Sequence, residues 1–167
     1  YFLSGKNSSQ QLYAMPVEGG EPRQLTAFVL DVGTYRVSPD GSRIAFSAET
    51  FADCAEDFAC TQTKLDERKN GKATGVVYDK LFVRHWDTWQ DGRRSRLYLA
   101  SLPAADAQAV ASAASLSAAL DGDVPSKPFG GAEDYVWTPD GTSIVASVRI
   151  AGNSEPWSTN FDLYRLP

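Results

Sequence analysis

Two segments of the chain repeat one order of apolar and polar positions, 100 residues apart. They read YRVSPDGSRIAFS at 35–47 and YVWTPDGTSIVAS at 135–147. In each, a short apolar strand leads into Ser/Thr-Pro-Asp-Gly, and an alternating apolar strand follows. Pro presets φ for a turn and Gly accepts the positive φ that the turn requires. Alternation on both sides of such a turn predicts two β-hairpins.

A second element, a Leu-Tyr pair within an apolar stretch, occurs at 12–13, 97–98 and 163–164. It alternates with the hairpins along the chain, and the shortest spacings give a period close to the roughly 40–50 residues of a four-stranded propeller blade. We therefore predict an all-β fold, a partial β-propeller of about three four-stranded blades, some of them incomplete. A small open β-sandwich is the alternative.

Two insertions interrupt this period, at about residues 50–94 and 104–125. The second contains AADAQAVASAASLSAALDGD, whose alanine content predicts a short helix that ends at Asp121-Gly122. The first contains both cysteines and the stretch VYDKLFVRHWDTWQDG. Its charged strings at 53–57 and 64–72 are typical of a solvated helix or loop. Insertions between propeller strands are tolerated and often carry binding residues.

Composition limits the classes of function. A net charge of −5 disfavours a nucleic-acid partner. We expect the one basic cluster, residues 93–96, to form a solvated turn. No apolar run is long enough to span a membrane.

Cys54 and Cys60 either form a disulfide in an oxidising compartment or remain free buried thiols. One histidine and two cysteines do not complete a zinc site, so neither metal nor cofactor is predicted.

Both termini fall on strand-like residues, YFLSG at the start and DLYRLP at the end. We therefore expect a piece of a longer protein. The edges of its terminal sheets would be open to pairing with missing sequence or with another copy.

The segments SPDGSRIAF and LYAMPVEGGEPRQLT resemble the WD40-like repeats of the TolB type. Such repeats also form the N-terminal domain of prolyl-oligopeptidase-family serine peptidases. The pieces VRHWDTW, DVPSKPFGGAEDY and EPWSTNFDLY resemble bacterial dipeptidyl aminopeptidases of the dipeptidyl-peptidase 5 and acylaminoacyl-peptidase branch.

The resemblance implies a two-domain enzyme, in which a propeller covers an α/β-hydrolase domain with a Ser-Asp-His triad. The enzyme would remove dipeptides from peptide N-termini in the periplasm or outside the cell. Residues 1–167 would be a fragment of its propeller that gates and positions the peptide. The alternative is a TolB-like periplasmic scaffold with no enzyme attached.

No catalytic residue is assigned. The nearest string to a nucleophile elbow, Gly141-Thr142-Ser143, lacks the second glycine and enters a strand. A dipeptidyl peptidase must capture a charged α-amino group, which calls for a carboxylate beside an aromatic wall. Asp79 or Asp87 could supply that carboxylate. The predicted mouth of the peptide cavity consists of Arg84, His85, Trp86, Asp87 and Trp89.

Each of these assignments has a structural alternative. His85 could instead fix a connection by bonding to the backbone or to Asp87. In the second candidate segment, Trp157 and Asn160 either contact substrate or, in the case of Trp157, cover the edge of a blade.

Overall fold

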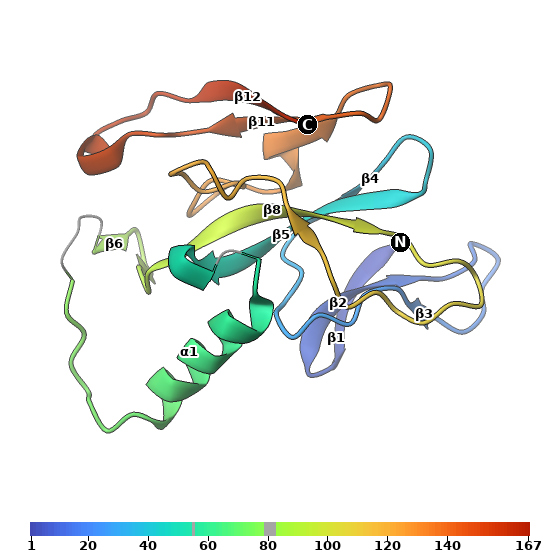
Figure 1. The fold of residues 1–167 in the computed structure, drawn as a ribbon, viewed down its shortest axis with the longest axis horizontal. Coiled ribbons are helices and arrows are strands. Elements are labelled where there is room, and N and C mark those ends of the chain that lie inside the picture. Colours follow the sequence, from blue (N-terminus) through green and yellow to red (C-terminus); the bar gives the residue numbers. More distant parts are fainter. Residues whose placement is uncertain (55, 79–82) are drawn as a thin grey trace.

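In the computed structural model, residues 1–54, 56–78 and 83–167 are described, and they are mostly β-structure with one α-helix (Figure 1). Three antiparallel sheets of three or four strands follow one another along this described part of the chain, and none closes on itself. The N-terminal sheet contains β1 (Phe2–Asn7), β2 (Ser9–Ala14) and β3 (Arg23–Gln24). The middle sheet contains β4 (Tyr35–Val37), β5 (Arg43–Phe51), β8 (Arg93–Ser101) and β9 (Ala114–Ser115). The C-terminal sheet contains β10 (Tyr135–Trp137), β11 (Ile144–Val148) and β12 (Asp162–Leu166).

Shorter elements lie in the connections. The strands β6 (Arg84–His85) and β7 (Thr88–Trp89) form a two-stranded hairpin. The helix α1 (Phe58–Asn70) follows the single 3₁₀ turn η1 (Ala52–Cys54). Two further 3₁₀ turns are η2 (Ala132–Asp134) and η3 (Gly152–Ser154).

Both predicted Pro-Asp-Gly hairpins are confirmed, β4–β5 and β10–β11. Their registers are identical, since Tyr35 pairs with Phe46 as Tyr135 pairs with Ala146. In the second turn, Asp140 accepts hydrogen bonds from the Thr138 hydroxyl (2.6 Å) and the Thr142 amide (3.0 Å). These bonds lower the pKa of Asp140 to about 2.

The two hairpins pack directly against each other. The Arg43 guanidinium donates to the Gly141 carbonyl at 2.6 Å, and the Trp137 indole donates to the Arg36 carbonyl at 3.0 Å. Burial raises the pKa of Tyr135, at the same contact, to about 12. The repeated segments therefore occupy equivalent places in adjacent sheets.

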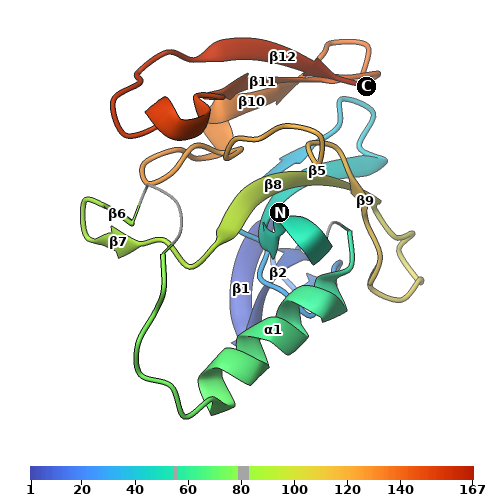
Figure 2. The same ribbon diagram turned by 60° about the vertical axis from the view of Figure 1, so that its left-hand side comes forward.

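The middle sheet is buried on both faces. Since successive strand residues point to opposite sides, neighbouring residues of one strand belong to different apolar clusters. One apolar cluster fills the contact with the N-terminal sheet and another fills the contact with the C-terminal sheet. On β5, Phe46 faces the first cluster and its neighbour Ala45 the second; on β8, Tyr98 and Leu97 divide in the same way. The three sheets therefore stack in chain order, as Figures 1 and 2 show.

The prediction of a helix in the second insertion was wrong. Residues 104–125 contain turns, β9 and an isolated parallel bridge between Thr26 and Val110, but no helix. The Val110 amide donates to the Leu25 carbonyl (2.9 Å), and the Val110 carbonyl accepts from Ala27 (2.8 Å). Pairing with the neighbouring sheet thus overrides the helix propensity of the alanines.

The α-helix lies instead in the first insertion, where a solvated helix or loop was expected. Asp57 caps it, because its side chain accepts the Cys60 amide at 3.0 Å. Phe58, in the first turn, packs edge-on against Phe28 and Tyr98 in the cluster between the N-terminal and middle sheets. This contact fixes one end of α1 to the core, while most of its remaining surface is exposed.

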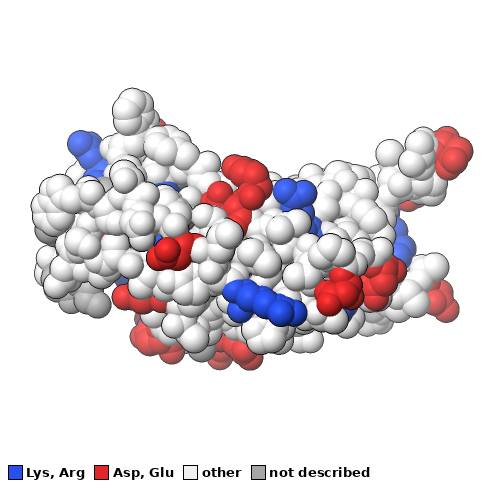
Figure 3. All heavy atoms as spheres, turned by 90° about the horizontal axis from the view of Figure 1, so that it is seen from above, with Lys and Arg blue, Asp and Glu red and all other residues white. Residues whose placement is uncertain are grey.

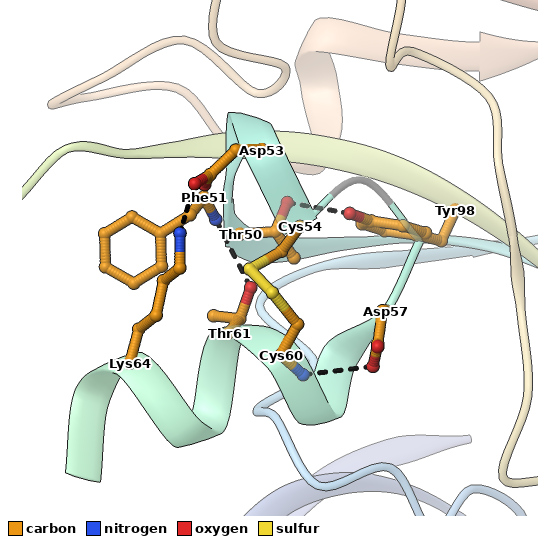
Figure 4. The surroundings of a disulfide bond; sticks show 9 residues. All are labelled: Thr50, Phe51, Asp53, Cys54, Asp57, Cys60, Thr61, Lys64 and Tyr98. Carbon is orange, nitrogen blue, oxygen red and sulfur yellow. Dashed lines mark hydrogen bonds and ion pairs between the residues drawn. A yellow bond between two sulfur atoms is a disulfide. The ribbon is translucent and has the colours of Figure 1, made fainter. Parts of the chain in front are cut away.

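A disulfide joins Cys54 to Cys60, and so ties the end of β5 to the first turn of α1 (Figure 4). Beside it, the Thr61 hydroxyl accepts the Phe51 amide at 3.3 Å. Lys64 forms an ion pair with Asp53 across the same turn. The helix therefore leaves the sheet in a fixed direction.

The basic cluster at residues 93–96 is not the solvated turn that was expected. It forms the start of β8, and Arg96 is buried. On the face shown in Figure 3, acidic and basic side chains are interspersed on a largely uncharged surface. Across the described residues, no helix has the length and apolar content required to cross a membrane.

Candidate functional site

Three long connections of the middle and C-terminal sheets lie at one end of the strands, on the left in Figure 1. They comprise residues 52–92, 116–134 and 149–161. The Pro-Asp-Gly turns lie at the opposite end, because adjacent strands of each hairpin are antiparallel. All the predicted site residues that are described therefore lie at the end with the long connections.

The β6–β7 hairpin brings together five of the predicted site residues. The Arg84 guanidinium lies over the Trp89 ring, 5.3 Å from its centroid. Trp86, at the turn, has φ of 55° and is 74% exposed. A bulky residue with positive φ is uncommon and strained, and such residues cluster at functional sites. The hairpin therefore presents an indole to solvent at some cost in backbone energy.

His85 connects this hairpin to the segment that leads into the C-terminal sheet. Its ring meets Phe129 edge-on, with centroids 6.2 Å apart. On the other strand, Trp89 lies 6.3 Å from Tyr78. Aromatic contacts at these distances stabilise the positions of both rings. His85 therefore has a packing contact with a residue of another connection.

Asp87 lies at the tip of the hairpin and is exposed. Its carboxylate accepts a long hydrogen bond, 3.4 Å, from the Thr88 hydroxyl. Asp79, the other proposed carboxylate, lies outside the described residues. An acidic group beside two indoles is thus present, but on an open surface.

The second candidate segment lies between β11 and β12. Trp157 is 75% exposed, and the Asn160 side-chain amide donates to Asp162 at 3.3 Å. Most of the Trp157 side chain is therefore accessible at the surface.

A cavity of about 650 Å³ opens where the N-terminal sheet, the end of β5 and the segment 125–130 meet. Its polar wall includes Glu49, which pairs with Lys127 at 2.6 Å and with Arg93 at 3.0 Å. The cavity exceeds the lower size range of small-molecule sites, about 300 Å³.

A second cavity, of about 350 Å³, lies between residues 76–78, the start of β8 and Glu155. Arg94 is central to it, because it binds Asp123 at 2.9 Å and Glu155 at 3.1 Å. Burial opposes the charge of Arg94, but the hydrogen bonds and charges of Glu155 and Asp123 more than offset it, so the pKa of Arg94 is raised. Arg149 also approaches Glu155, at 3.7 Å.

None of the seven predicted residues is among those that line either cavity in the described part of the chain. The sequence patterns did not indicate the charged residues that line these cavities, among them Glu49, Arg93, Arg94, Lys127 and Glu155. The available signal was the run Arg93-Arg94 at the start of an apolar strand, because buried arginines require partners. Glu155 is also the first residue of the EPWSTNFDLY segment.

No protein-family profile matches the chain. It is 30% identical over 165 residues to a dipeptidyl-peptidase 5 of Porphyromonas gingivalis, and 29% identical over 168 residues to one of Porphyromonas endodontalis. A dipeptidyl-peptidase 4 of Giardia intestinalis is 26% identical over 183 residues. The chain is related to dipeptidyl peptidases. Each alignment covers 98% of the chain but only 22–23% of the relative, so the chain spans about a fifth of the length of these proteins.

Proposed function

We propose that residues 1–167 are part of the β-propeller domain of a serine dipeptidyl aminopeptidase of the prolyl-oligopeptidase family. The observation that carries this proposal is the extent of the similarity, which covers 98% of the chain in three proteins named dipeptidyl peptidases. In this proposal, catalysis resides in a C-terminal α/β-hydrolase domain, and residues 1–167 alone are not catalytic.

The arrangement of the sheets supports the propeller. Each blade of a propeller is a small antiparallel sheet that buries its faces against its neighbours. The middle sheet has four strands and is covered by a neighbouring antiparallel sheet on each side. The N-terminal and C-terminal sheets would then be incomplete blades of three strands each.

The connections at one end of the sheets would gate and position the peptide substrate. The exposed indoles of Trp86 and Trp157 offer aromatic surface, and Asp87 offers a carboxylate for the α-amino group. The cavity of about 650 Å³ at the same end is large enough to hold a short peptide segment. The disulfide supports a periplasmic or secreted enzyme, because such bonds persist in oxidising compartments.

The test uses the longer polypeptide that contains residues 1–167 and dipeptidyl p-nitroanilides as substrates. We expect dipeptide release, and a KM at least about tenfold higher in Asp87→Asn, since a charge-assisted hydrogen bond contributes about 1.5–3 kcal/mol. Asp106→Asn, at an exposed position in another connection, is the control. An unchanged KM in Asp87→Asn removes Asp87 from the site.

Residues 1–167 alone should release no p-nitroaniline. If the longer polypeptide is equally inactive toward dipeptidyl and aminoacyl substrates, the peptidase proposal fails and the scaffold alternative takes its place.

A further inference from the structure

Phe129 is a large apolar side chain that the fold leaves in solvent. It lies in the connection between β9 and β10 and is 74% exposed. Single apolar residues on a surface are ordinary, but two further features distinguish this one. Its backbone is held by a tight turn, and its ring contacts the β6–β7 hairpin. A side chain that recognises a ligand needs such a fixed position.

Hydrogen bonds on both sides of Phe129 hold its backbone. The Gly130 amide donates to the Ser126 carbonyl at 2.7 Å. The Asp134 carboxylate accepts the Ser126 amide at 2.8 Å and the Ser126 hydroxyl at 2.9 Å. A Cβ on Gly130 would overlap the Ser126 carbonyl oxygen and the Asp134 carboxylate, so the turn closes only with glycine there. The turn therefore fixes where the Phe129 side chain starts.

The ring of Phe129 lies between the hairpin and the cavity of about 650 Å³. It meets the His85 ring edge-on, with centroids 6.2 Å apart. His85 lies two residues before Asp87, at the tip of the hairpin. The residues on both sides of Phe129, 125–128 and Gly130, line the cavity. Phe129 therefore stands at the rim of the cavity, on the side of the hairpin.

The contact with Phe129 also shows which face of the hairpin is turned toward this rim. Arg84 pairs with Trp89 and His85 pairs with Thr88, so the two pairs project from opposite faces. Since His85 meets Phe129, the His85 face is the nearer one. Arg84 and Trp89 contact each other on the opposite face.

We propose that Phe129 determines specificity for the N-terminal residue of the peptide, by contacting its side chain as the peptide runs from Asp87 into the cavity. This inference rests on the proposed function, in which Asp87 binds the α-amino group. The first side chain of a peptide branches from the same carbon as that amino group, so it falls beside the hairpin and not deep in the cavity. The Phe129 ring favours an apolar side chain there, and an aromatic one most, because aromatic pairs are stabilised beyond the area that they bury.

The test uses the longer polypeptide that contains residues 1–167, with Phe-Ala-p-nitroanilide and Gly-Ala-p-nitroanilide as substrates. The two substrates differ only in the first side chain, so the ratio of their kcat/KM values measures its recognition. We expect the ratio to favour Phe-Ala, and to fall at least about fivefold in Phe129→Ala through a higher KM for Phe-Ala. Phe129→Tyr keeps the ring and should keep the ratio.

Val17→Ala is the control, because Val17 is apolar, 99% exposed and lies in the connection between β2 and β3. It should leave the ratio unchanged. An equal loss of kcat/KM for both substrates in Phe129→Ala would assign Phe129 to holding the hairpin through His85, and would overturn the proposal. A ratio that is the same in Phe129→Ala as in the unaltered protein would overturn it too.

Failure of the peptidase proposal gives a different result, since neither substrate would then release p-nitroaniline. Binding of Phe-Ala-Gly-amide and Gly-Ala-Gly-amide, measured by isothermal titration calorimetry, then decides the role of Phe129. Tighter binding of the Phe peptide that is lost in Phe129→Ala supports the contact. Equal binding of the two peptides, or no binding of either at millimolar concentration, overturns it.

Discussion

At the scale of single residues, the buried charges matter most, because they hold the connections to the strands. Asp123 and Glu155 are both nearly inaccessible, and Arg94 is their common partner. Removal of one member of such a group leaves the others as uncompensated buried charges. The Arg94 network therefore determines how residues 149–161 are seated on β8.

We predict that Arg94→Met lowers the free energy of unfolding by about 3 kcal/mol, because it strands two buried carboxylates. Urea denaturation followed by circular dichroism measures this. Lys69→Met, at an exposed position near the end of α1, is the control and should change stability by less than about 0.5 kcal/mol. Equal midpoints for the two variants would show that the network contributes nothing.

The ion-pair partners of Arg93 and Arg94 could not be predicted from the sequence, although the two arginines themselves stand out as a basic run. Adjacent strand residues point to opposite faces, so Arg93 joins Glu49 and Asp91 while Arg94 joins Asp123 and Glu155. Most of these partners are distant in the chain, and no local pattern assigns them. Residues 84–89 lie together in one hairpin because they are contiguous in the chain.

At the scale of elements, the hairpins were predictable because their turn chemistry is local. Within one four-residue turn, Asp40 accepts the Ser42 amide and the adjacent Gly41 adopts positive φ. Asp140 and Gly141 repeat this arrangement. The alanine-rich segment gave the opposite result, since Val110 is captured by the N-terminal sheet. Local propensity was decisive only where no distant strand competed for the same backbone groups.

The turn glycines offer a direct measure of this local chemistry. Gly41 has φ of 73°, and a Cβ there would meet nothing within 4 Å. Gly41→Ala should therefore lose about 1 kcal/mol through backbone strain alone. Gly5→Ala in β1 has equal space without positive φ, and should be neutral or slightly stabilising. Chemical denaturation of both variants separates strain from packing; an equal effect on the two would contradict the assignment.

At the scale of the whole molecule, stability is concentrated in the middle sheet. Its two faces are both covered, whereas the C-terminal sheet is covered by the middle sheet on one face. The repeat provides a matched comparison, because Leu97 and Leu163 hold equivalent positions in the two sheets.

Leu97→Ala should lower the free energy of unfolding by about 3 kcal/mol, as large-to-small changes in a packed core do. Leu163→Ala should change it by less than about 0.5 kcal/mol, because that side chain is largely exposed. Urea midpoints of the two variants test this directly. Similar losses would mean that the open face of the C-terminal sheet is covered in solution.

The separation of tight turns from long connections gives the two ends of the sheets different freedom to change. At the Pro-Asp-Gly end, an added residue would alter the register of a hairpin that contacts its neighbour through Arg43 and Gly141. At the other end, lengthening a connection costs only about 0.6 kcal/mol for each doubling of its length. Related proteins can therefore diverge in recognition at one end while an unchanged set of turns keeps the spacing of their sheets.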